Sequence, residues 1–144
     1  YEFRPRNWDK ANQYGLQNLL TLLNSARKRH PALQQLHRIQ VHQTSDDRLL
    51  CFSKHVPAKF SPTGEEDTVI VVVNLDPHNE VVGSVDIDLS KLGDTINYGT
   101  GGPILEVVDE LDGREYQWGE YNFVKLNPQE RTAHVMAVKN NKTN

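Results

Sequence analysis

The hydrophobic period of this chain changes near His37, and that change constrains its fold more than any other feature. Before His37, apolar side chains recur at intervals of three and four residues, which is typical of an amphipathic helix. After it, apolar and polar side chains alternate, which is typical of half-buried strands. The chain is therefore predicted to be mainly β, with an N-terminal helix followed by an antiparallel β-sandwich or barrel.

The helix is predicted over residues 16–30. Its basic last turn suits the negative end of a helix, and Pro31 disfavours helical geometry at His30. Residues 1–14 show no period and are predicted to be a loop or linker. The apolar stripe consists of Leu16, Leu19, Leu20, Leu23 and Ala26.

The β region is predicted to hold seven or eight short strands separated by turns and no further long helix. Residues 68–75 are apolar on both faces, which indicates a central strand. Residues 56–67 and 93–103 are rich in proline or glycine and are predicted to be loops. The strands are expected near residues 38–42, 48–55, 68–75, 81–89, 104–108, 115–118, 121–126 and 132–138.

Composition excludes several classes of protein. The 144 residues carry a formal charge of −3, so no basic surface is available for nucleic acid or an anionic membrane. The longest apolar run, 69–73, is far shorter than a membrane-spanning helix. Cys51 is the only cysteine and cannot form an internal disulfide, so we expect a cytoplasmic protein. The chain begins at Tyr1 and its only methionine is Met136, so we expect a C-terminal piece of a longer protein.

No metal site, cofactor or catalytic residue is predicted within the chain. The six histidines do not pair with cysteine at ligand spacing, and they are expected to lie on the surface or bonded in the core. Cys51 lies between Leu50 and Phe52 and is expected to be an inert core thiol. The glycines at 99–102 are not followed by a lysine or a helix, so they do not match a phosphate-binding loop. The cluster Asp109, Glu110 and Asp112 precedes Gly113 and is expected to be a hairpin turn rather than a calcium site.

Two features leave alternatives open. At 100° per residue, Arg27 falls in the middle of the leucine stripe. Its side chain either reaches nearby carbonyl groups or pairs with a carboxylate of a neighbouring domain. Trp118 and Tyr121, near a strand junction, either pack in a core or form a platform on which sugar rings stack.

Four segments are similar to one family of enzymes. Residues 22–33, with Arg27 and the run Pro31-Ala32-Leu33, resemble the last barrel helix of the α-amylase superfamily, glycoside hydrolase family 13. Segments 1–9, 71–78 and 108–119 resemble, in matching order, the C-terminal part of bacterial maltose-1-phosphate maltosyltransferases. Loops 56–67 and 93–103 do not match this family.

The resemblance implies a β-sandwich of the amylase domain C type and a parent enzyme that extends α-1,4-glucan with maltosyl units from maltose 1-phosphate. It implies three parts: a linker and last barrel helix over 1–36, the sandwich over 37–139 and a disordered tail over 140–144. The partner would be the (β/α)8 barrel of the same polypeptide, in a homodimeric parent. The retaining mechanism would use two aspartates and a glutamate that lie upstream, so the chain alone would be inactive. Tyr1 would approach the donor sugar.

Two other functions compete with this one. The chain could be an autonomous carbohydrate-binding module that uses Trp118 and Tyr121, or domain C of an α-amylase-type hydrolase. On the barrel-helix interpretation, the isolated chain would expose its leucines and either self-associate through residues 16–30 or fold the helix back onto its own sheet.

Overall fold

The computed structural model describes residues 2–5, 7–13, 15–93, 97–99 and 102–139. Tyr1 and the tail predicted for 140–144 lie outside the described residues. Two α-helices, α1 (Trp8–Gln13) and α2 (Leu16–Arg29), precede the strands, and the short 3-10 helices are η1 (Pro31–Gln34), η2 (Ala58–Phe60) and η3 (Leu89–Lys91). The strands are β1 (Ile39–Thr44), β2 (Leu49–Val56), β3 (Asp67–Asn74), β4 (Val81–Asp86), β5 (Asn97–Gly99), β6 (Gly102–Asp109), β7 (Glu115–Trp118), β8 (Tyr121–Leu126) and β9 (Ala133–Val138).

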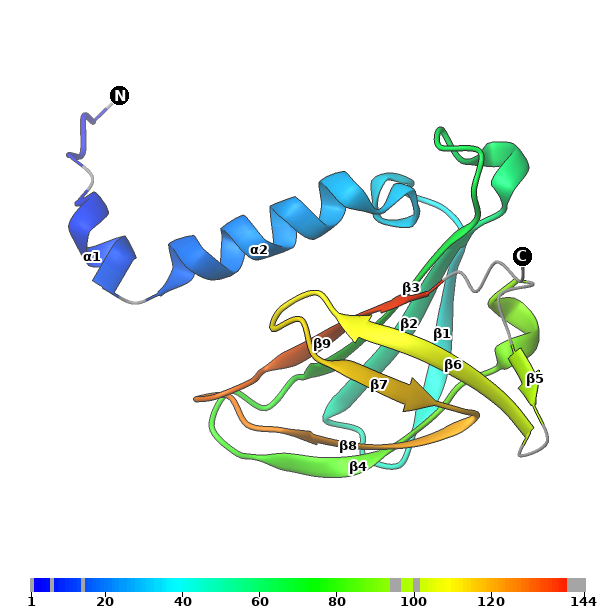
Figure 1. Cartoon of the computed structure of the whole chain (residues 1–144). Helices are drawn as coiled ribbons and strands as arrows, with labels where there is room; N and C mark the ends of the chain where they lie inside the picture. Colours follow the sequence, from blue (N-terminus) through cyan, green and yellow to red (C-terminus); the bar gives the residue numbers. More distant parts are fainter. Residues whose placement is uncertain (1, 6, 14, 94–96, 100–101, 140–144) are drawn as a thin grey trace.

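The predicted fold class is confirmed. The strands pair antiparallel in the order β7-β6-β9-β3-β2-β1-β4-β8, and β5 adds to β6. The sheet curls until it is nearly closed, so that its two halves face one another around one interior (Figure 1). β3 pairs with β2 on one side and β9 on the other, which confirms it as a central strand.

The curled sheet encloses an apolar core supplied by alternate residues of seven strands. On β3, Ile70 and Val72 point inward and are fully buried. The ends of the sheet contribute Trp118 from β7 and Val124 from β8. Because inward residues alternate with outward ones along each strand, the period of two fixes which face of the sheet becomes the interior.

A second, smaller core lies on the outside of the sheet. Ala32 of η1 is fully buried against Val69 and Val71 of β3 and Val135 of β9. This explains why β3 is apolar on both faces. Its inner side chains pack in the interior of the curled sheet, and its outer side chains are covered by η1.

The helix predicted over 16–30 is confirmed as α2, but the loop predicted for residues 1–14 contains the short helix α1. The side chain of Asn7 accepts the backbone N–H of Lys10 at 3.2 Å and so caps the first turn of α1. Capping stabilises a single turn without requiring the apolar period on which the prediction depended.

Two strand boundaries also differ from the prediction. The strand expected over 81–89 ends at Asp86 because Asp88 accepts the N–H of Ser90 and starts η3. Leu89 is nevertheless buried, as its place in the alternation requires. Within the loop expected over 93–103, the described residues 97–99 form β5 with the beginning of β6.

The long helix α2 does not pack along the curled sheet. It leaves the sheet at η1 and projects away from it, carrying α1 at its far end (Figure 1). Of the residues along α2, only Ala26, near its C-terminal end, is buried. Across the described parts of the chain, no helix combines the length and apolar character that crossing a bilayer would require.

Candidate docking surface

The apolar side of α2 is exposed. Leu16 and Leu20 keep 56% and 55% of their surface accessible, values expected of polar surface residues rather than of leucines on a predicted core-facing stripe. Five exposed leucines lie on this helix, namely Leu16, Leu19, Leu20, Leu22 and Leu23.

A groove of about 510 Å3 separates α2 from the sheet. Leu19, Leu22 and Leu23 line it on the helix side, and Leu111 and Ala133 line it on the side of the sheet. The wall formed by α2 is therefore apolar, whereas the opposite wall also carries polar and charged side chains, namely Asp112, Gln129, Glu130, Arg131 and Thr132.

The outer face of the sheet extends this apolar surface beyond η1. Val41 of β1 is 60% exposed and stands beside Phe52 of β2, which in turn stands beside Val71 of β3. Leu36, between η1 and β1, is 99% exposed. Val71 itself is buried, so Val41 and Leu36 are the exposed apolar residues here, and exposed apolar area is typical of surfaces that are covered by another polypeptide.

One histidine fixes the end of α2 to the sheet. His30 contacts Asp67 of β3 through Nδ1 at 2.8 Å and Glu110, after β6, through Nε2 at 3.2 Å. Asp67 also accepts the backbone N–H of Ala32 at 2.8 Å, and Arg29 forms an ion pair with Glu110. An imidazole ring can donate from both nitrogens only when it is protonated, so the geometry favours the charged ring.

The protonation of these groups follows from the same contacts. Burial alone would lower the pKa of His30, but the hydrogen bonds and charges of Asp67 and Glu110 outweigh it, and the pKa is raised. Burial would raise the pKa of Glu110, but Arg29 and His30 outweigh it, and that pKa is lowered. The positive charge of His30 and the negative charge of Glu110 therefore each stabilise the ionised form of the other residue.

The side chain of Arg27 does not bond to nearby carbonyl groups of the described residues, which was one of the two alternatives for it. Its side chain is exposed and makes no ion pair or hydrogen bond to the described part of the chain. It lies beside Leu20 and Leu23 on the exposed apolar side of α2. Pairing with a carboxylate of a neighbouring domain stays a prediction.

The remaining candidate residues have ordinary structural roles. His42 is buried and bonds to Ser53 at 2.7 Å, and His134 is buried and bonds to Asp109 at 2.8 Å. No group of three or more potential metal ligands occurs among the residues described. Cys51 is buried, and burial raises the pKa of its thiol to about 12.

The predicted hairpin after β6 is confirmed. Asp109 ends β6, Gly113 adopts the left-handed conformation with φ of 75°, and β7 starts at Glu115. The carboxylate of Asp109 accepts the N–H of Leu111 at 3.1 Å, which holds the turn.

Trp118 and Tyr121 do not form a joint platform. Trp118 points into the core and is 6% exposed, whereas Tyr121 points outward from β8 and is 74% exposed. The two rings therefore lie on opposite faces of the sheet. Tyr1, the residue expected near the donor sugar, lies outside the described residues.

The contacts of His30 carry no local sequence signal. Its partners Asp67 and Glu110 lie 37 and 80 positions away in the chain and were predicted to belong to a loop and a turn. Only the pairing of β3 with β9, and of β9 with β6, brings the two carboxylates to one side of η1.

Comparison with known proteins gives a consistent result. A family model described as "GLGE, C-terminal" matches residues 41–138. The chain is 46% identical over 138 residues to the alpha-1,4-glucan:maltose-1-phosphate maltosyltransferase of Bifidobacterium longum, covering 96% of this chain and 18% of the relative. It is 45% identical over 139 residues to the enzyme of that name from Arcanobacterium haemolyticum, covering 96% and 20%.

The similarity extends to more distant relatives. The Mycobacterium tuberculosis protein with the same name is 38% identical over 138 residues, covering 94% of this chain and 18% of the relative. The chain thus spans about a fifth of the length of the curated relatives that it matches.

Proposed function

The chain belongs to the GLGE C-terminal family, and from this membership we propose that it is the non-catalytic C-terminal part of an enzyme that extends α-1,4-glucan with maltosyl units from maltose 1-phosphate. Its role would be to pack on the catalytic (β/α)8 barrel of the same polypeptide and to stabilise it. Residues 1–36 would form the linker and last helix of that barrel, and residues 37–139 the domain that follows.

The exposed apolar side of α2 is the observation that carries this proposal. Burying a leucine side chain contributes about 1.5–3 kcal/mol, so a helix that leaves five leucines exposed forfeits several kcal/mol unless something covers it. The resemblance of residues 22–33 to a last barrel helix supplies a covering surface, and the relatives are about five times longer than this chain.

The chemistry would lie upstream of this chain. On the resemblance, two aspartates and a glutamate of the barrel carry out a retaining double displacement, and this chain contributes none of them. Tyr1 would approach the donor sugar, and Tyr1→Phe in the intact enzyme is then expected to lower kcat/KM for maltose 1-phosphate. We place the parent in the cytoplasm, as a homodimer.

A pair of variants in the intact parent tests the packing role. Leu20→Asp with Leu23→Asp would put two charges into the buried contact and is expected to lower the temperature of half-inactivation by several degrees. The matched control is Asn18→Asp with Thr21→Asp, which adds the same charge on the polar side of α2 and is expected to change little. Equal stability of the two double variants would contradict the proposal.

A second experiment tests the absence of catalysis in this chain. The purified 144-residue chain is expected to release no phosphate from maltose 1-phosphate in the presence of glycogen, whereas the intact parent does. Phosphate release by the chain, retained through repeated purification, would contradict the proposal.

The hydrolase alternative has less support than the transferase. Each of the three relatives named above is called a maltosyltransferase, and segments 71–78 and 108–119 resemble that family. Hydrolysis of maltoheptaose by the intact parent without any transfer from maltose 1-phosphate would favour the alternative.

A further inference from the structure

The curled β-sheet of this chain is not fully closed, and its open seam lies between β7 and β8. β7 and β8 are joined by only two residues, Gly119 and Glu120, yet no ladder pairs them among the described strands, and they form the two edges of the curled sheet. Asn122 holds this corner, because its side chain accepts the N–H of Gly119 and donates to its carbonyl, each at 2.8 Å.

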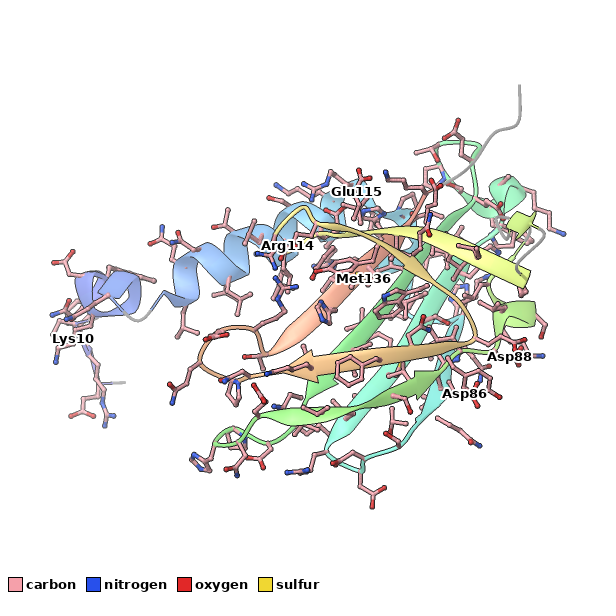
Figure 2. All side chains as sticks on the ribbon, turned by 60° about the horizontal axis from the view of Figure 1, so that its bottom comes forward. Lys10, Asp86, Asp88, Arg114, Glu115 and Met136 are labelled. Atoms are coloured by element: carbon pink, nitrogen blue, oxygen red, sulfur yellow. The ribbon has the colours of Figure 1, made fainter. Side chains whose placement is uncertain are left out.

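The seam opens into a cleft of about 510 Å3. Trp118 of β7, Val124 of β8 and Met136 of β9 give it apolar walls, and Figure 2 shows Met136 between the curved strands. A cavity of about 150 Å3 accommodates one benzene ring, so this cleft has room for more than one ring-sized unit.

Two buried aromatic residues that line this cleft, in edge contact with one another, each keep a ring nitrogen without a hydrogen bond to the described residues. Trp118 and His134 are 6% and 7% exposed, and both line the cleft. Nδ1 of His134 bonds to the fully buried carboxylate of Asp109, so in the neutral ring Nε2 is left as an acceptor. Within the described residues, nothing bonds to that Nε2 or to the indole N–H of Trp118. A buried polar group without a partner costs free energy, so this pair of atoms calls for a ligand.

The cations that line the cleft already contact carboxylates, whereas the carboxylate of Glu130 makes no ion pair with the described residues. Arg131 contacts Asp109 at 3.3 Å and also pairs with Asp112, and Lys125 contacts Glu80 at 3.3 Å. An anionic ligand would compete with these carboxylates and would be repelled by Glu130. A neutral ligand would not, and a hydroxyl group can accept from the indole N–H while another donates to Nε2 of His134.

We propose that the cleft between β7 and β8 binds a segment of neutral carbohydrate, specifically α-1,4-glucan. Apolar ring walls with one donor and one acceptor suit the alternating apolar and hydroxyl faces of a sugar ring. The choice of α-1,4-glucan among sugars rests on the proposed function, whereas the choice of a neutral hydroxylated ligand rests on the cleft. Binding of glucan in this cleft would give the domain a second role besides packing.

The experiment is a titration of the 144-residue chain with maltoheptaose, followed by the two indole N–H signals in 1H–15N spectra. Trp118 is expected to shift and saturate at millimolar sugar. Trp8, which is 70% exposed and lies on α1, is a control within the same molecule and is expected not to shift. Cellohexaose and inorganic phosphate are expected to shift neither signal.

Variants separate the cleft from other aromatic surfaces. Trp118→Phe keeps an aromatic ring but removes the donor, and it is expected to weaken binding of maltoheptaose at least fivefold. Tyr121→Ala and Trp8→Phe are expected to bind like the original chain. Because the titration of the original chain needs no variant, misfolding of Trp118→Phe would not obscure the result.

Three results would overturn the proposal: no shift of Trp118 with maltoheptaose, equal shifts of Trp8 and Trp118, or equal binding of cellohexaose. None of these would affect the proposed function, which is decided by transfer activity and stability of the intact parent. A loss of transfer activity by the intact parent together with normal binding in the cleft would instead contradict the proposed function alone.

Discussion

His30 is the residue whose protonation matters most for the position of α2. It bridges Asp67 and Glu110 from both ring nitrogens, and its pKa is raised above the ordinary 6.5. A group with a raised pKa in the folded state stabilises that state below its unfolded pKa, and the stabilisation is lost as pH rises through the folded pKa. We expect the free energy of unfolding to fall as pH rises above 6.5 through that value.

The variant His30→Gln tests this expectation. It can serve only part of the contacts to Asp67 and Glu110, so it is expected to lower the free energy of unfolding at pH 6 by about 1–3 kcal/mol. It is also expected to flatten the dependence of stability on pH above 6.5, as measured by urea unfolding at several pH values. The control His78→Gln alters an exposed ring and is expected to do neither. An unchanged pH profile in His30→Gln would contradict the assignment.

Asp109 is the most deeply buried carboxylate described, with no exposed surface. Burial would raise its pKa, but hydrogen bonds from His134 and from the N–H groups of Leu111 and Val135 outweigh it, and the pKa is lowered. Asp109→Asn is expected to lower the free energy of unfolding by about 3 kcal/mol at pH 7, because charge-assisted bonds are lost. Urea unfolding measures this loss.

The matched control for Asp109→Asn is Asp47→Asn, at an exposed turn position. A surface change of this kind is expected to stay within about 0.5 kcal/mol. If the two variants were equally stable, the buried carboxylate would have no structural role. The loss in the original chain is expected to appear also as pH falls through the folded pKa of Asp109, since a lowered pKa stabilises the folded state only above the unfolded value.

For single residues, the sequence predicted which side chains are buried better than it predicted their hydrogen-bond partners. Leu89 was expected on the apolar face from alternation, and Cys51 was expected in the core because it lies between Leu50 and Phe52; both are buried. The contacts of His30 and the bond between Asp109 and His134 join residues 25 to 80 positions apart. Such contacts depend on strand order, which a hydrophobic period does not specify.

At the element scale, α2 makes a specific prediction for the isolated chain. Its leucine side is uncovered, and exposed apolar surface favours association. We expect the chain to form dimers through residues 16–30 at micromolar concentrations in sedimentation experiments, and Leu20→Asp with Leu23→Asp to shift it to monomer. Circular dichroism is expected to show that the β-sheet of this variant is intact.

The polar-side variant Asn18→Asp with Thr21→Asp controls for charge and is expected to remain dimeric. A monomeric original chain would show that the leucines tolerate water, and the barrel-helix interpretation would lose its physical basis.

The elements that sequence predicted well are those with a long, regular pattern. α2 has fourteen residues and β3 has eight, and both were expected within one or two positions of their bounds. α1 and β5 have six and three residues, and neither was expected. Short elements are stabilised by caps and by strand pairing rather than by an amphipathic period, so a periodic analysis does not detect them.

For the molecule as a whole, the rate at which Cys51 reacts with a thiol reagent measures how often the curled β-sheet opens. It lies in the core, and its thiol pKa is raised to about 12, so it has neither access nor reactivity in the folded state. We expect iodoacetamide at pH 8 to label it at least on the order of a thousandfold more slowly in buffer than in 8 M urea, since global stabilities of domains are about 5–15 kcal/mol.

The control for this measurement is Cys51→Ala with Gln117→Cys, which places the thiol on the exposed face of β7. It is expected to react rapidly in buffer and in urea alike. Rapid labelling of Cys51 in the native chain would mean that the sheet opens locally. We would expect such opening to start at the unpaired edges of β7 and β8.

The antiparallel β class followed from sequence at this scale, but the seam did not. Turns and alternation predict that strands 115–118 and 121–126 are neighbours in the chain, and neighbouring strands usually pair. Here they diverge, because Ile87 donates its N–H to the carbonyl of Glu120 and β8 pairs with β4 instead.

Because α2 is attached to the sheet only at its C-terminal end, a small rotation there moves its other end by a large distance. With 14 residues at about 1.5 Å each, the helix is roughly 21 Å long, and its pivot is the contact of His30 with the sheet. Turning it by about 10° at the pivot would move the far end by roughly 3.6 Å, a displacement comparable to the width of a methyl group. On the proposed packing, the catalytic barrel that covers the leucines would fix the position of α1, and Asp67 and Glu110 would fix only the direction in which α2 leaves the sheet.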